Sequence, residues 1–326
     1  NLAMCMACTV CRGGRPSDAY LPRPQEALGV RKNACGTELF THFLPLYLSA
    51  EHFRYSLCCR CLQAAWARVL LEQVPEVADP KEVNDAVWHV LPALMNSTAV
   101  ALVGGELHTS DLALRGYYNL HRLFLAMATA EHRASAAKEV ELFENDPDKR
   151  LKRYCPNLGH FLPRLLLLND PIEAWSKICD CVLQEAIDRT VLHAFREHPG
   201  LSQEADDKQY VQRRWESAAK GLRMLLFSVR FFRHAAKWGS PEHVAAHYDK
   251  FYGQASPAEC EDFRREVLRV KSLNSWEAFS QHWCAEAGID SQDLQHYSVR
   301  LGGAGLAALV AVLRDSEKNS RTKGYH

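Results

Sequence analysis

The sequence predicts an all-α protein, in which a multi-helix globular body follows a small Cys-rich, loop-rich N-terminal module. Apolar residues recur with helical spacing from residue 62 onward, and no alternation of apolar and polar residues exceeds four or five positions. The cysteines are clustered, because seven of the 12 lie in the first 61 residues. We therefore expect a module over residues 1–61 and a helical body over residues 62–326.

The composition is that of an ordinary globular chain. Hydrophobic residues make up 47% of the 326 positions and charged residues 24%, and the formal net charge is zero. No global field therefore attracts the chain to nucleic acid or acidic lipid. The apolar runs are too short to span a bilayer, and the first residues show no secretory signal. A chain of this size folds without disulfides, so we expect a cytoplasmic protein in a reducing compartment. We also expect the chain to be a segment of a larger protein and to have no membrane partner.

Two Cys-x-x-Cys pairs predict a metal site in the N-terminal module. Cys5 and Cys8 form one pair, and Cys58 and Cys61 form the other. This spacing places two thiolates on one tetrahedral ion, so we expect these four residues to bind a structural zinc. Further ligands could come from the other Cys and His residues of the module: Cys11, Cys35, Cys59, His42 and His52. Buried free thiols and redox-active thiols remain alternative interpretations.

Prolines, glycines and capping residues delimit the expected helices. In chain order, the helical or apolar segments cover residues 62–74, 80–103, 110–130, 161–168, 172–198 and 210–238, then begin near 241, 257, 275, 291 and 306. A polar linker is expected near residues 200–208. The tail over residues 316–326 is polar and basic, and we expect it to fray.

The segment 210–238 is the longest helical pattern, and apolar residues cover nearly all of its sides. Such a helix is mostly buried, so we expect four of its residues in the core: Leu225, Leu226, Val229 and Phe232. One stripe of the same helix is basic, and it contains Lys220, Arg223, Arg230 and Lys237, with His234 among them. Aromatic residues near this stripe make an RNA-binding surface an alternative. We favour a solvated seam, or pairing with acidic neighbours.

No catalytic arrangement follows from the spacing of residues. No base stands beside a thiol, and neither Gly-Gly pair matches a phosphate-binding loop. The later cysteines Cys155, Cys179 and Cys181 are expected to pack in the core. Cations stand near Cys59 and near Cys155, but neither thiol has a His beside it in the sequence.

Several phrases carry a resemblance to a known domain. They include Phe43–Leu48, Leu91–Asn96, Pro156–Pro163, Asp188–Leu192 and Lys323–His326. These phrases resemble an uncharacterised helical domain of large multidomain proteins from protists and fungi, where it occurs beside ubiquitin-conjugation modules. The resemblance spans residues 37–326 and implies no catalytic residues.

The function that these observations favour is a protein-interaction module of a larger cytosolic protein, with a link to the ubiquitin system implied by the resemblance. One alternative is a thiol-dependent transferase that uses an N-terminal cysteine. The other is an RNA-binding helical domain that uses the basic stripe. The identity of the protein partner does not follow from the sequence.

Overall fold

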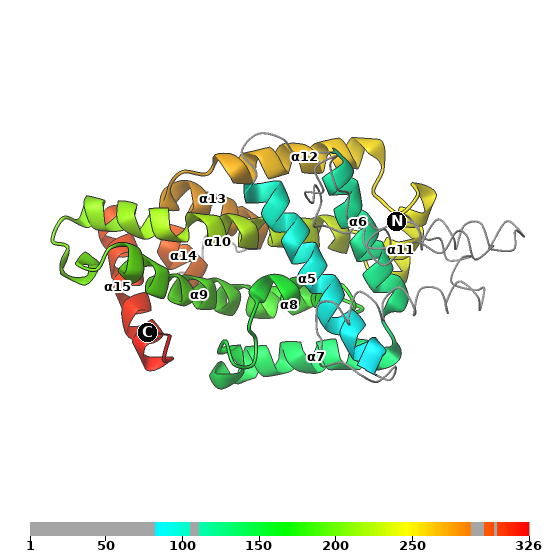
Figure 1. Ribbon diagram of the computed structural model, residues 1–326, viewed down its shortest axis with the longest axis horizontal. Helices are drawn as coiled ribbons and strands as arrows, with labels where there is room; N and C mark the ends of the chain where they lie inside the picture. Colours follow the sequence, from blue (N-terminus) through cyan, green and yellow to red (C-terminus); the bar gives the residue numbers. More distant parts are fainter. Residues whose placement is uncertain (1–81, 105–110, 288–296, 303–304, 326) are drawn as a thin grey trace, which may run out of the picture. The chain divides into compact units, whose positions relative to one another are not determined.

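The computed structural model describes residues 82–104, 111–287, 297–302 and 305–325 (Figure 1). All regular structure in these residues is helical, which confirms the predicted all-α class. The module predicted over residues 1–61 and the helix predicted over residues 62–74 lie outside the described residues. The chain divides into two compact units, of which unit 1 comprises Asn1–His132 and Pro241–Asp262, and unit 2 comprises Arg133–Ser240 and Phe263–His326.

The described helices of unit 1 pack around a continuous apolar core. They are α5 (Glu82–Gly104), α6 (Asp111–Met127), α11 (Pro241–Lys250) and the first part of α12 (Pro257–Ser272). Both α5 and α11 pack on α6. Helix α5 buries residues at intervals of three and four positions, as one face of a helix requires: Trp88, Leu91, Met95, Ala99 and Leu102.

Polar contacts join α6 to α11 inside unit 1. The Arg122 guanidinium donates to both carboxylate oxygens of Asp249, at 2.8 and 2.9 Å. Next to it, Nδ1 of His121 lies 3.2 Å from the hydroxyl of Tyr248. Burial, together with the neighbouring Arg122 charge, lowers the pKa of His121 to about 3. His121 is therefore neutral at physiological pH, and its role is to join the two helices.

In unit 2, α9 and α10 form an antiparallel pair that lies side by side in Figure 1, and α8, α13 and α15 each pack on both. The described helices of the unit are α7 (Ala130–Asn145), α8 (Leu158–Leu165), α9 (Pro171–Glu197), α10 (Asp207–Ala236), the rest of α12, α13 (Trp276–Ala287), α14 (Tyr297–Gly302) and α15 (Gly305–Thr322). Short 3-10 turns occur at Pro147–Arg150 and Leu201–Gln203. The second of these turns lies in the predicted polar linker and joins α9 to α10 within the unit.

Helices α9 and α10 begin at aspartate caps and meet in an aromatic core. The Asp170 carboxylate accepts a hydrogen bond from the backbone N–H of Glu173, and Pro171 follows it at the first helical position. The ring of Trp175 lies 5.7 Å from that of Phe232. The prediction for the long helix is confirmed, because Leu225, Leu226, Val229 and Phe232 are all buried.

The prediction that residues 316–326 fray is wrong. Helix α15 continues to Thr322 and ends in a Schellman motif, with the N–H of Tyr325 bonded to Ser320 O and that of Gly324 bonded to Arg321 O. Gly324 has φ +69°, a conformation that glycine adopts without steric cost. This turn directs Tyr325 back onto unit 2, where it is 8% exposed. Contacts with distant residues therefore order a segment whose composition alone predicts fraying.

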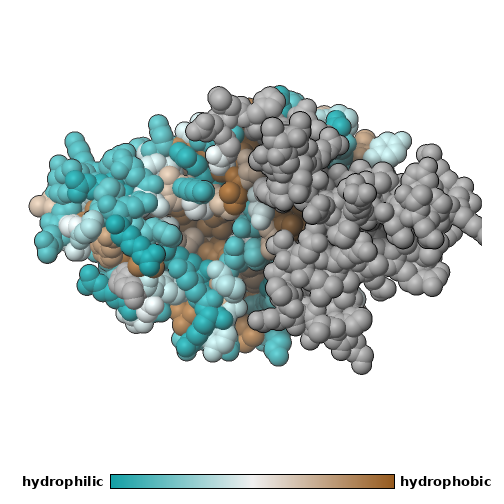
Figure 2. Space-filling view, viewed as in Figure 1, coloured by the Kyte–Doolittle hydropathy of each residue, from teal (hydrophilic) through white to brown (hydrophobic). Residues whose placement is uncertain are grey.

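The described surface of unit 2 is largely hydrophilic near the end of α9 and the beginning of α10, on the face shown in Figure 2. None of the described helices combines the length and the apolar character that crossing a membrane would require.

Candidate functional site in unit 2

A row of polar residues on α9 faces α15. Gln184 and Asp188 follow Asp180 at intervals of four residues, so these three side chains lie along one face of the helix. Glu185 lies beside them, and the side chains of Glu185 and Asp188 are both fully buried. Asp and Glu are almost never fully buried without a partner, and Lys323 contacts both of these carboxylates.

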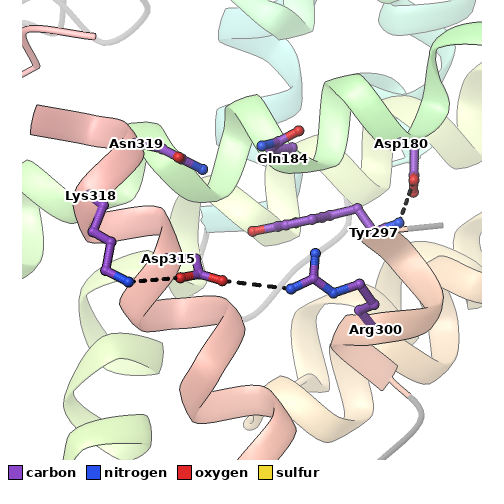
Figure 3. Close-up of a pocket in the computed structure, with 7 residues that line it drawn as sticks. All are labelled: Asp180, Gln184, Tyr297, Arg300, Asp315, Lys318 and Asn319. Carbon is purple, nitrogen blue, oxygen red and sulfur yellow. Dashed lines mark hydrogen bonds and ion pairs between the residues drawn. The ribbon is translucent and has the colours of Figure 1, made fainter. Parts of the chain in front are cut away.

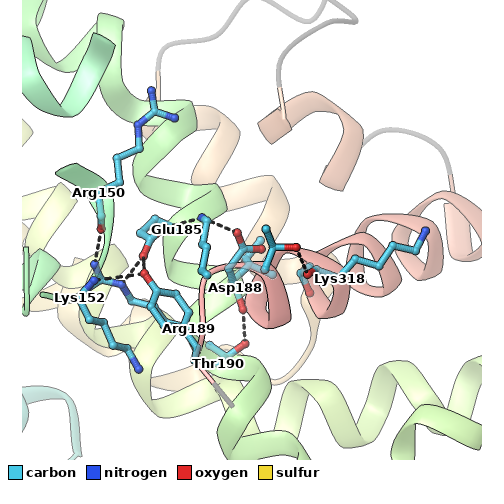
Figure 4. A network of polar contacts seen from close by, with 12 residues as sticks. Arg150, Lys152, Glu185, Asp188, Arg189, Thr190 and Lys318 are labelled. Atoms are coloured by element: carbon cyan, nitrogen blue, oxygen red, sulfur yellow. Dashed lines mark hydrogen bonds and ion pairs between the residues drawn. The ribbon is translucent and has the colours of Figure 1, made fainter. Parts of the chain in front are cut away.

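Glu185 is surrounded by donors (Figure 4). Its Oε1 accepts a hydrogen bond from Arg189 Nε at 2.7 Å and another from the Tyr325 hydroxyl, and its Oε2 lies 2.6 Å from Lys323 Nζ. Burial alone raises the pKa of Glu185, but the bonds from Lys323, Tyr325 and Arg189 outweigh burial and hold the pKa below its usual value. Glu185 is therefore ionised at neutral pH.

Asp188 has fewer compensating partners than Glu185. Its Oδ2 lies 2.8 Å from Lys323 Nζ, and Lys323 also serves Glu185. Burial raises the pKa of Asp188 to about 6, even though the bond from Lys323 opposes that effect. Burial lowers the pKa of Lys323, but its bonds to the two carboxylates outweigh burial and raise it. One lysine of the C-terminal segment thus contacts both carboxylates of a buried acidic pair on α9.

The same network holds the loop before α8. Arg189 donates to the backbone carbonyls of Arg150 and Cys155, each at 2.7 Å. The hydroxyl of Tyr325 accepts a hydrogen bond from the backbone N–H of Lys152 at 3.2 Å. These contacts join three parts of unit 2 that are far apart in sequence: the loop, α9 and the end of the chain.

A polar pocket of about 400 Å³ lies beside this network (Figure 3). Three helices supply its walls. The lining residues are Asp180 and Gln184 of α9, Tyr297 and Arg300 of α14, and Asp315, Lys318 and Asn319 of α15. The pocket therefore depends on α15 lying against α9, the arrangement that Lys323 and Tyr325 stabilise.

Tyr297 forms the inner wall of the pocket. Its backbone N–H donates to the Asp180 carboxylate, and its side chain points into the space between Gln184 and Asp315 (Figure 3). The residue is 8% exposed, and its hydroxyl has no hydrogen-bond partner among the described residues. Burial raises the pKa of Tyr297 above its usual value. The hydroxyl therefore keeps its proton at neutral pH and can donate to a ligand.

The rim of the pocket is charged and exposed. Asp315 lies 3.2 Å from Lys318 Nζ and 3.6 Å from an Arg300 side-chain nitrogen. The side chains of Arg300, Asp315 and Lys318 are 50%, 47% and 78% exposed. Ion pairs with this much exposure are worth little energetically, so a ligand can replace them.

None of the cysteines in the described ranges lines this pocket. Burial raises the pKa of Cys155, Cys181 and Cys284, and it raises that of Cys179 to about 11. A thiol with a raised pKa is protonated and weakly nucleophilic at neutral pH. The arrangement of donors and charges is suited to binding a polar ligand.

The residues predicted to bind zinc lie outside the described residues: Cys5, Cys8, Cys11, Cys35, His42, His52, Cys58, Cys59 and Cys61. Zinc binding at these positions stays a prediction. In the ranges that the structure does describe, no group of three or more His, Cys, Asp or Glu side chains is arranged to hold a metal ion.

The residues of the predicted basic stripe have different roles in the structure. Arg230 is 7% exposed and pairs with Glu266 of α12 and with Glu286 of α13, the latter at 3.4 Å. Arg223 donates to the backbone carbonyl of Leu273 at 2.9 Å. The two lysines of the stripe, Lys220 and Lys237, are exposed. The two arginines thus join α10 to neighbouring segments.

Composition and spacing did not single out five residues that define the site: Glu185, Asp188, Tyr297, Lys323 and Tyr325. A partial signal was present on α9, because Glu185 and Asp188 stand three residues apart on either side of the apolar pair Ala186 and Ile187.

Comparison of the chain with protein-family models, with curated proteins and with solved structures gives no significant match.

Proposed function

We propose that this chain is a protein-interaction module of a larger cytosolic protein, and that it binds a peptide segment of its partner in the pocket between α9, α14 and α15. The observation that carries the proposal is the buried hydroxyl of Tyr297, which has no partner among the described residues. Burying such a group costs about 1–3 kcal/mol, and a ligand that accepts its hydrogen bond removes that cost.

A peptide suits the pocket better than an apolar small molecule. Sites for small molecules are lined mostly by hydrophobic and aromatic side chains. Here six of the seven lining residues carry a carboxylate, an amide, a guanidinium or an ammonium group, and the seventh is Tyr297. Such a lining matches the amide and charged groups of a polypeptide.

A selection of random 12-residue peptides against the full chain tests this proposal. Gln184→Phe places an aromatic ring in the pocket, and we expect it to weaken binding of the selected peptides at least tenfold. Arg196→Phe is the matched control, because it places the same ring at an exposed position of α9 outside the pocket, and it should leave binding unchanged. If no peptide is selected, or if both variants bind like the original chain, the proposed site is wrong.

The resemblance makes ubiquitin-conjugating enzymes the first partners to test. The proposal expects the chain to bind such an enzyme without forming a thioester itself. A ubiquitin thioester that appears on the chain and disappears when Cys11, Cys35 or Cys59 is changed to Ser would instead establish a transferase.

A further inference from the structure

The rim of the pocket has an uneven distribution of charge. Arg300 and Lys318 approach from different helices, and both contact the single carboxylate of Asp315. These three rim residues hold one more positive than negative charge, whereas Asp180 on the opposite wall makes the seven lining residues neutral in sum. We propose, on the basis of the proposed function, that the group recognised in this pocket is a carboxylate of the bound peptide.

A carboxylate can enter without leaving any rim charge unpaired. If it takes Arg300 from Asp315, Lys318 still pairs with Asp315. A cationic ligand at the rim would have to compete with both Arg300 and Lys318 for Asp315, and at the opposite wall it would have to compete with the Tyr297 backbone N–H for Asp180. The planar Arg300 guanidinium also offers paired N–H donors, which match the two oxygens of a carboxylate.

The inner wall adds neutral donors to the cations of the rim. The protonated Tyr297 hydroxyl can donate one hydrogen bond, and the side-chain amides of Gln184 and Asn319 can donate others. Asp180 accepts a hydrogen bond from the backbone N–H of Tyr297. It lines the opposite side of the pocket, with Tyr297 between it and Asp315 (Figure 3). Acceptor groups of a ligand are thus favoured near Arg300 and Lys318, at the Asp315 end.

A phosphorylated peptide fits less well than a carboxylate. A phosphate group carries a charge of about −1.5 to −2 at neutral pH, more than the single surplus charge of the rim. It would also lie near Asp315, whose repulsion would grow with the added charge. The single charge of a carboxylate matches the surplus.

The carboxylate could be the C-terminus of the peptide or an Asp or Glu side chain, so the test separates these sources. The full chain is exposed to an array of hexapeptides, each in three forms: with a free C-terminus, with an amidated C-terminus, and amidated with one internal Glu. We expect at least one of the two carboxylate-bearing forms to bind at least tenfold more tightly than the neutral amide. Whichever form does so identifies the source.

Arg300→Gln should abolish that preference, whereas the exposed Arg321→Gln on α15 should retain it. Equal binding of all three forms would overturn the carboxylate inference, but it would leave the proposed peptide binding in place. The same conclusion follows if Arg300→Gln weakens all three forms equally. If no hexapeptide binds in any form, the proposed function fails together with this inference.

Discussion

Lys323 is the residue on which the buried acidic pair of unit 2 most depends. Replacing it with Met removes the ammonium group that contacts both Glu185 and Asp188. Glu185 keeps its bond from Arg189, but Asp188 loses its cation, and breaking a buried ion pair is strongly destabilising. We expect Lys323→Met to lower the free energy of unfolding by about 3 kcal/mol in urea denaturation.

Lys318→Met is the matched control, because Lys318 lies on the same helix with 78% of its side chain exposed. Its loss should change stability by less than about 0.5 kcal/mol. A similar small change for Lys323→Met would show that the buried network contributes little to folding.

Two tyrosines allow a comparison of a paired with an unpaired hydroxyl. Tyr325 donates to the Glu185 carboxylate, so Tyr325→Phe should cost about 1.5–3 kcal/mol. The Tyr297 hydroxyl has no partner among the described residues, so Tyr297→Phe should be neutral or stabilise the protein by about 1 kcal/mol. Thermal unfolding of the two variants measures the difference. A loss above about 1 kcal/mol for Tyr297→Phe would mean that its hydroxyl is satisfied in the folded chain, and the pocket would lose its main support.

At the scale of helices, the pairing of α9 with α15 should depend on pH. The folded-state pKa of Asp188 is about 6, above its usual value of 3.8, so the folded chain binds this proton more tightly than the unfolded chain. Protonated Asp188 therefore adds to the free energy of unfolding. This contribution is complete below about pH 4 and is lost as pH rises through about 6. Glu185 has a lowered pKa, so its stabilising contribution is lost only as pH falls below about 4.5.

Between pH 5 and 7, we therefore expect stability to fall by about 1 kcal/mol through Asp188 alone. Asp188→Asn should remove this part of the pH dependence, which parallel urea titrations of the variant and the original chain would show. Identical pH profiles for the two proteins would contradict the raised pKa.

Helix boundaries were predictable where the signals are local. Asp170 followed by Pro171 predicts the start of α9, and the aspartate does cap the helix. The end of α15 was not predictable from composition, because the groups that order it lie on α9, more than 130 positions earlier. Gly324 was a local signal for the Schellman ending, but nothing nearby in sequence indicates that Tyr325 meets Glu185.

The candidate site was less predictable than the fold, for a related reason. Periodicity assigns Glu185 and Asp188 to α9, but it does not show that their face is buried against a second helix. Tyr297 and Arg300 lie on a short helix that packs on α15, the next helix along the chain, and on α9, more than 100 positions earlier. Spacing in one sequence cannot reveal a pocket that joins helices so far apart.

At the scale of the whole molecule, the zinc prediction concerns residues outside the described ranges. We expect the purified chain to contain about one zinc ion, and Cys58→Ser or Cys61→Ser to lower both metal content and melting temperature. Cys181→Ser is the control, since that thiol belongs to no metal-binding group among the described residues, and it should leave the zinc content unchanged. Elemental analysis with thiol titration measures this, and a folded, metal-free protein with all twelve thiols titratable excludes the site.

The measurement that most directly tests the proposed function is photo-crosslinking of a selected peptide that carries a diazirine next to its carboxylate, followed by mass spectrometry of the adducts. If the pocket of unit 2 is the binding site, the adducts will fall on residues 297–302 and 315–319 and will disappear in the Gln184→Phe variant. Adducts confined to residues 1–61, or to any surface away from α9, α14 and α15, would contradict the account and assign peptide binding to another part of the chain.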